Sequence, residues 1–130
     1  MADLKAEPPL SPHLQIYRQS ISMVMSIVHR ITGAALYAGT LIMAWWLIAI
    51  AGGPQSYADF QSFAGSFVGR IVLFGFTWAL VHHMLGGLRH FVWDTGRGFD
   101  LATVDRMSWA TLIGSIVVTF ILWFIGYSVR

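Results

Sequence analysis

Residues 31–53 read ITGAALYAGTLIMAWWLIAIAGG and contain no charged side chain over 23 positions. An α-helix rises 1.5 Å per residue, so about 20 apolar residues can cross the hydrocarbon core of a bilayer. Two further runs share this property: residues 71–88, where only His82 and His83 can ionise, and residues 107–129. The sequence therefore predicts an all-α integral membrane protein with three transmembrane helices, which span about residues 22–52, 66–93 and 107–129.

The composition supports this class and excludes several others. The chain is 56% hydrophobic and only 11% charged, with a mean hydropathy of +0.65, which is typical of membrane proteins. Its eight basic residues are scattered and form no patch for phosphate, so we expect no nucleic acid partner. The chain has no cysteine, which excludes disulfides, iron–sulfur clusters and thiolate-held zinc and leaves histidine as the transition-metal ligand.

The regions outside the spans are short. Residues 1–19 hold Pro8, Pro9 and Pro12, which favour an extended N-terminal arm at the membrane surface, and residues 20–130 form the membrane-anchor domain. Glycine and proline at residues 52–54 predict that the first span ends there and that residues 55–65 form a loop. Residues 95–106 contain two glycines and two aspartates and also read as a loop.

Basic residues predict the orientation, because cytoplasmic flanks of transmembrane helices collect Lys and Arg. With the N-terminus on the cytoplasmic side, six basic residues fall on that side and two on the other; the six are Lys5, Arg18, Arg30, Arg89, Arg97 and Arg106, and the two are Arg70 and Arg130. We expect this N-in orientation. The first residues have no signal-peptide or transit-peptide pattern, which favours a bacterial inner membrane over a mitochondrial one.

The second span ends with an unusual run of ionisable residues, VHHMLGGLRHFVWD at 81–94. Ionisable groups in a transmembrane segment are costly and usually functional. At about 100° per residue, one face collects His83, Gly86, Gly87, His90 and Asp94, whereas His82 and Arg89 lie roughly 100–120° away. An imidazole with a glycine one turn along suits a flat macrocycle, since haem iron takes a histidine ligand and glycine leaves room for the ring.

This pattern makes His83 the better haem ligand and His82 the worse one, which would face a partner helix or a lipid. The alternative is that these histidines only form hydrogen bonds between helices and that the glycines allow close helix packing.

The first span has a polar face of its own. Ser26, His29 and Arg30 lie within one turn of each other, and Arg30 should lie level with His90 at the cytoplasmic end of the antiparallel second span. Hydroxyl and guanidinium groups at this boundary could donate hydrogen bonds to a quinone carbonyl or a haem propionate. The alternative is a positively charged anchor with a serine that bonds back to its own helix.

Two sets of residues in the chain resemble a known family. The first comprises Pro9, Leu10, Leu14, Ile21, Ser26, His29, Arg30 and Thr32, and the second His83, Gly87, Leu88, Arg89, His90, Trp93, Asp94 and Gly96. From about Pro9 to its end, the chain closely resembles the cytochrome b membrane-anchor subunits of succinate dehydrogenase, respiratory complex II. One departure is Pro8, which stands where the family usually has an arginine, so the surface contact of that arginine is in doubt.

The resemblance implies a non-catalytic subunit that anchors a flavoprotein and an iron–sulfur subunit and pairs with a second membrane anchor. It implies one haem b shared with that second anchor, with His83 as one axial ligand and with His29, Arg30 and His90 near the propionates. Gly87 leaves room for the ring. Ser26 and Arg30 match residues that line the ubiquinone site, where electrons from succinate, oxidised elsewhere in the complex, enter the respiratory chain.

Three alternatives stay open at this point. The chain could be a structural anchor without haem, or the anchor of a quinol:fumarate reductase, which runs the reaction backward. It could also be a self-contained cytochrome b that ligates haem within one chain through His29 and His83.

Overall fold

The computed structural model describes residues 18–129, which form four α-helices and no strand. α1 (Ile21–Ala51), α3 (Phe67–Asp94) and α4 (Leu101–Ser128) are long and apolar enough to cross a membrane, whereas α2 (Pro54–Gly65) is short. The predicted all-α class with three membrane-spanning helices is therefore confirmed. The N-terminal arm lies almost entirely outside the described residues, and its cytoplasmic location stays a prediction.

Each long helix begins at a side-chain cap. Ser20, Ser66 and Asp100 precede α1, α3 and α4, and each side chain accepts a hydrogen bond from the backbone N–H three residues further on. These bonds satisfy backbone donors that have no partner within the helix. The caps thus set the first residue of every candidate span.

The segment predicted as a loop at 55–65 is instead helix α2, so that expectation was wrong. Gly53 takes φ +90°, a conformation that favours glycine, and Pro54 then starts the new helix. Phe60 is buried, and its ring packs edge-on against Trp45 of α1 at a centroid distance of 5.0 Å. This aromatic contact packs α2 against α1, although the sequence of α2 is too polar to predict a membrane-spanning helix.

α4 begins at Leu101, six residues before the predicted start of the third span at residue 107. The charged Asp105 and Arg106 lie on its exposed side, and the Arg106 Nε donates to the carbonyl of Ala102 at 3.2 Å. Residues 101–106 therefore belong to the helix although they interrupt the apolar run.

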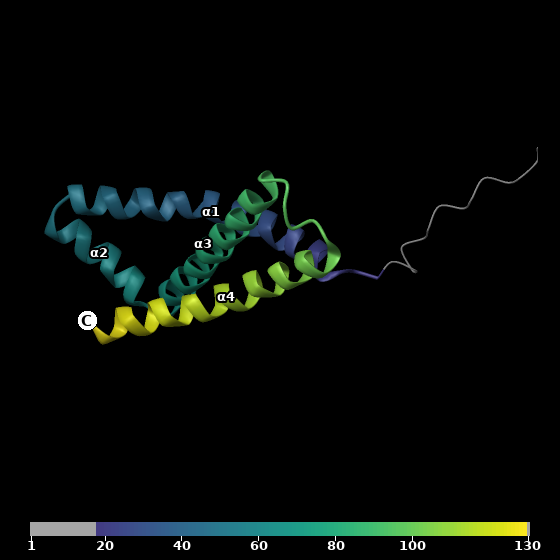
Figure 1. Cartoon of the computed structure of the whole chain (residues 1–130). Coiled ribbons are helices and arrows are strands. Elements are labelled where there is room, and N and C mark those ends of the chain that lie inside the picture. The colour runs from purple at the N-terminus through teal and green to yellow at the C-terminus, as the bar shows by residue number, and fades with distance from the viewer. Residues whose placement is uncertain (1–17, 130) are drawn as a thin grey trace, which may run out of the picture.

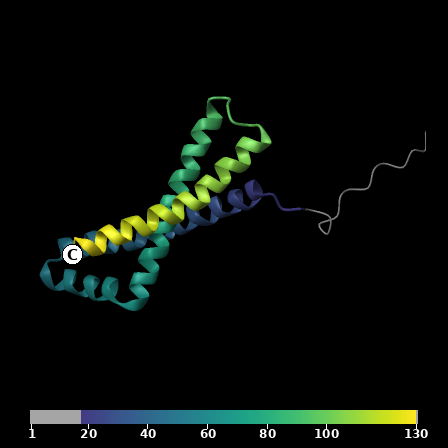
Figure 2. The same cartoon turned by 60° about the horizontal axis from the view of Figure 1, so that its bottom comes forward.

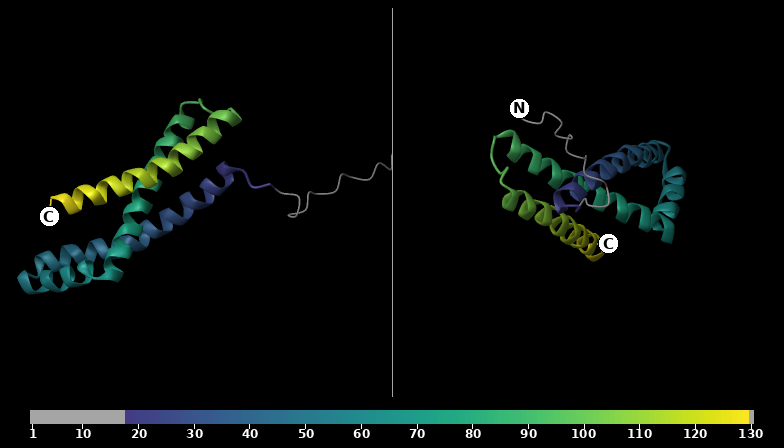
Figure 3. Two further views of the ribbon diagram at one scale, coloured as in Figure 1. Left: turned by 90° about the horizontal axis from the view of Figure 1, so that it is seen from below. Right: turned by 90° about the vertical axis from the view of Figure 1, so that its right-hand side faces the viewer.

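α3 is the central element of the fold. It runs diagonally between α1 and α4 and packs against both (Figures 1 and 2). α2 joins the end of α1 to the start of α3, and the end of α4 lies at this same end of the molecule (Figure 3). The start of α1 and the α3–α4 loop lie at the opposite end, which we name the His90 end; the end at α2 is named the α2 end.

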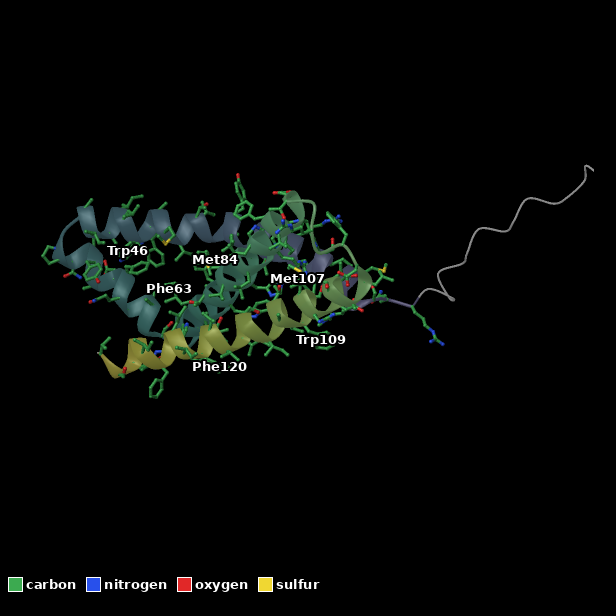
Figure 4. All side chains as sticks on the ribbon, in the orientation of Figure 1. Trp46, Phe63, Met84, Met107, Trp109 and Phe120 are labelled. Carbon is green, nitrogen blue, oxygen red and sulfur yellow. The ribbon has the colours of Figure 1, made fainter. Side chains whose placement is uncertain are left out.

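The interior of this bundle is unusually polar. On α4 a row of hydroxyl side chains is buried: Ser108, Thr111, Ser115 and Thr119. Large apolar side chains point outward, as Figure 4 shows for Trp109 and Phe120, which are 52% and 61% exposed. Helices in lipid associate through small residues and hydrogen bonds rather than through apolar burial, so this distribution is that of a membrane protein.

Candidate functional site

The side chain of His83 is held by the backbone of α1. Its Nδ1 lies 3.1 Å from the carbonyl oxygen of His29 and 3.4 Å from the Thr32 hydroxyl. The Thr32 hydroxyl itself donates to the same His29 carbonyl at 2.9 Å. A carbonyl only accepts, so Nδ1 carries the proton in this contact. The ring therefore presents Nε2 as its lone-pair nitrogen, the arrangement common in metal-ligating histidines.

Three histidines from α1 and α3 meet around this contact. The His29 and His83 rings stack with a centroid distance of 3.9 Å and an interplanar angle of 5°. The His90 ring lies 5.3 Å from that of His29 and is tilted by 55°. The start of α1 and the end of α3 thus lie side by side, as the antiparallel arrangement predicted.

Two glycines make room for the stacked rings. A Cβ at Gly33 would lie 3.0 Å from Cε1 of His83, and a Cβ at Gly86 would lie 2.5 Å from Nδ1 of His29. α1 and α3 therefore approach each other closely at the level of the rings, because each helix has a glycine there, Gly33 on α1 and Gly86 on α3. The residues that were predicted to share one face of α3 therefore do not all face the same space. The His29 ring occupies the space beside Gly86, so that this space is not available to a cofactor.

Gly87 lies on the open side of α3. A Cβ built there meets no atom of the described residues within 4 Å, and His83 one turn earlier is only half-buried. A flat macrocycle with one histidine ligand requires an open glycine one turn from a histidine, and within residues 18–129 the Nε2 of His83 makes no hydrogen bond. The residues present fit haem. Within residues 18–129, no cluster of three or more His, Cys, Asp or Glu side chains could hold a bare metal ion.

Ser26 and Arg30 are both exposed on α1, one turn apart. Most hydroxyls in these helices donate to a carbonyl three or four residues back, as Thr32, Ser108 and Thr119 do. Among the described residues, the Ser26 hydroxyl makes no such bond. The back-bonding alternative for Ser26 is therefore not observed, and its hydroxyl is available to a ligand.

His82 and Arg89 turn to the opposite side of α3 and contact the chain's own α4. The His82 Nδ1 lies 3.1 Å from the Ser115 hydroxyl, and the Arg89 Nη1 donates to the Ser108 hydroxyl at 2.9 Å. Both α3 side chains are buried, at 1% and 5% exposure. Helical periodicity correctly predicted that His82 and His83 lie on different faces of α3. The expected neighbour of His82 was a partner helix or a lipid, whereas the structure places α4 of the same chain there.

The pattern of ionisable residues in the second span did not point to these two serines. Each donates its proton to its own helix, Ser108 to Val104 and Ser115 to Leu112, at 2.8 Å in both cases, so its oxygen can accept from α3. The available signal was the row of hydroxyl residues at spacings of three and four along the third span, which marks one helix face.

The chain is similar to membrane subunits of one known protein family. The family model described as succinate dehydrogenase/fumarate reductase transmembrane subunit matches residues 5–122. A succinate dehydrogenase cytochrome b556 subunit of Paracoccus denitrificans is 41% identical over 129 residues, 96% of this chain and 99% of that protein. The corresponding subunit of Rickettsia felis is 38% identical over 88% of this chain and 90% of its own length. The mitochondrial cytochrome b560 subunit of Sus scrofa is 32% identical over 88% of this chain and 69% of its own length.

Proposed function

Because this chain belongs to the succinate dehydrogenase/fumarate reductase transmembrane subunit family and is a cytochrome b membrane anchor of that family, we propose that it shares one haem b with a second anchor subunit and helps to form a ubiquinone site. In this proposal the flavoprotein and iron–sulfur subunits bind at the His90 end, on the cytoplasmic face of a bacterial inner membrane. Succinate is oxidised in the flavoprotein, and this chain takes no part in that step.

The observation that carries the haem part is the bond from His83 Nδ1 to the His29 carbonyl. It orients the imidazole and fixes the proton on Nδ1, so that Nε2 would bind the haem iron as one of its ligands. Gly87 leaves space for the ring, and His29, Arg30 and His90 would surround it near the propionates. When bound, haem b supplies a one-electron store within the membrane. The second ligand would come from the partner anchor.

Ser26 and Arg30 carry the quinone part. Both side chains are exposed and one turn apart on α1. As a quinone accepts electrons, negative charge develops on its carbonyl oxygens, and a hydroxyl together with a guanidinium stabilises that charge by hydrogen bonding. The protons that complete reduction to quinol come from the aqueous phase at the His90 end.

The haem assignment is tested by the absorption spectrum of the purified complex. His83→Ala should remove the α-band of the reduced b-type haem or reduce it strongly. His82→Gln is the matched control, because it changes the neighbouring histidine and keeps a polar group toward Ser115. An unchanged spectrum in His83→Ala would contradict the assignment. Absence of a b-type α-band in the unaltered complex would favour the structural anchor instead.

The quinone assignment is tested by two rates measured on one preparation. Ser26→Ala and Arg30→Leu should each slow succinate-dependent quinone reduction about 10- to 150-fold, the loss expected for a charge-assisted hydrogen bond of about 1.5–3 kcal/mol. Oxidation of succinate by an artificial acceptor should be unaffected. Arg97→Leu, an exposed arginine in the α3–α4 loop at the same end, serves as the charge control. Equal loss of both rates would indicate failed assembly.

A further inference from the structure

A second candidate site lies at the α2 end, far from the histidines. A cavity of about 690 Å³ opens between α2, the start of α3 and the end of α4. Arg70 lines it, 13 residues before His83 on the same helix, which places the two about 20 Å apart along the helix axis. The cavity is therefore separate from the proposed haem and quinone sites.

The lining of the cavity combines polar and apolar side chains. Arg70, Gln61 and the tyrosines 57 and 127 supply polar groups, whereas Phe60, Leu73 and Leu122 supply apolar surface. The Trp123 indole donates to the Thr77 hydroxyl at 3.2 Å, so these two groups satisfy each other inside the wall. A site of this volume that has a few polar groups in a largely apolar lining is suited to an amphipathic ligand.

The charge of the cavity selects the kind of ligand. Arg70 is exposed and, among residues 18–129, is the only charged residue that lines the cavity. The one carboxylate on α2, Asp59, does not line the cavity and accepts a hydrogen bond from Gln55. Arginine binds phosphate oxygens through paired N–H donors. The exposed Arg70 guanidinium in this lining therefore suits the negatively charged phosphate group of a ligand.

The position of the cavity indicates where this phosphate comes from. α2 lies between the end of α1 and the start of α3, which are both candidate membrane spans, so we expect the cavity at the headgroup level of a bilayer. Tyrosine and tryptophan collect at this level in membrane proteins, and Tyr57, Trp123 and Tyr127 all line the cavity. We propose that the cavity between α2, α3 and α4 binds an anionic phospholipid, whose phosphate pairs with Arg70 and whose acyl chains lie along Leu73 and Leu122.

This proposal is tested by lipid binding to the intact complex. The complex would be delipidated in detergent and titrated with phosphatidylglycerol while bound lipid is counted by native mass spectrometry. Arg70→Gln should weaken phosphatidylglycerol binding about 10- to 100-fold, whereas Arg97→Gln at the His90 end should leave it unchanged. Equal binding by Arg70→Gln and the unaltered complex would overturn the proposal.

A second variant tests the apolar part without altering the charge. Gly126 lines the cavity, and a Cβ there meets no atom of residues 18–129 within 4 Å, so Gly126→Phe should fill the space and prevent the lipid from binding. Phosphatidylcholine should bind at least tenfold more weakly than phosphatidylglycerol, and inorganic phosphate should not compete at millimolar concentration. Three outcomes would each refute the lipid assignment. They are equal binding of the two lipids, competition by inorganic phosphate alone, and crosslinking of a residue at position 126 to a partner helix.

Discussion

Two adjacent glycines of α3 provide a matched test of how α1 and α3 meet. Gly86→Ala places a Cβ 2.5 Å from Nδ1 of His29, whereas Gly87→Ala places one in open space. Both substitutions increase helix propensity by the same amount, up to about 1 kcal/mol. The difference between the two variants therefore isolates the overpacking at the His29 ring.

The expected difference follows from the contact distance. A Cβ at 2.5 Å from a ring atom is closer than van der Waals contact, so the imidazole or the helix must move. Overpacking of this kind typically costs about 1–3 kcal/mol. We expect Gly86→Ala to be about 1–3 kcal/mol less stable than Gly87→Ala, and Gly87→Ala to be at least as stable as the unaltered protein when no haem is bound.

The measurement is chemical unfolding in mixed micelles, followed by the helical circular dichroism signal of preparations made under haem limitation. With haem supplied, Gly87→Ala should lose its advantage and retain less haem, because its methyl group occupies the space proposed for the ring. Equal stability of the two variants would refute the packing of His29 against Gly86. Full haem retention by Gly87→Ala would refute the role assigned to Gly87.

Two further outcomes follow from the α3–α4 contact and from the cap of α4. Ser108→Ala leaves the buried guanidinium of Arg89 without the hydroxyl that it now donates to at 2.9 Å, so the unfolding free energy should fall by about 1.5–3 kcal/mol. Ser128 is exposed and its hydroxyl bonds only to its own helix, so Ser128→Ala should change the unfolding free energy little. A comparable loss of unfolding free energy in both variants would contradict the role of the contact between Arg89 and Ser108. Hydrogen bonds from Thr103 hold the pKa of Asp100 below its ordinary value, so its contribution to stability is complete above that value and is lost as the pH falls through the lower folded pKa. In thermal melts between pH 6 and 3, the melting temperature of the unaltered protein should approach that of Asp100→Asn as the pH falls. A difference in melting temperature that does not change with pH would count against this role of Asp100.

The apolar runs alone predicted the class of the protein. Uncharged segments of membrane-spanning length specify transmembrane helices because every backbone polar group must be satisfied within the segment. The same argument could not find α2, whose sequence has no such run. Pro54 after Gly53 is a helix-start signal, but the packing of Phe60 against Trp45 is a contact between residues that are distant in the sequence, which the local pattern does not show.

Helical periodicity also separated the histidines correctly. It placed His82 and His83 on different faces, because the angle between successive residues is a local property of the helix. It could not say which neighbour each face meets, since that depends on how α3 crosses α1 and α4.

The sequence by itself thus determined three helices and the face on which each polar group lies. Only the tertiary structure decided that His83 is oriented by the His29 carbonyl, that His82 is occupied by Ser115, and that Gly87 rather than Gly86 is open. The physical reason is that periodicity and hydropathy are properties of one segment, whereas the availability of a nitrogen or a space depends on which other helix lies against it.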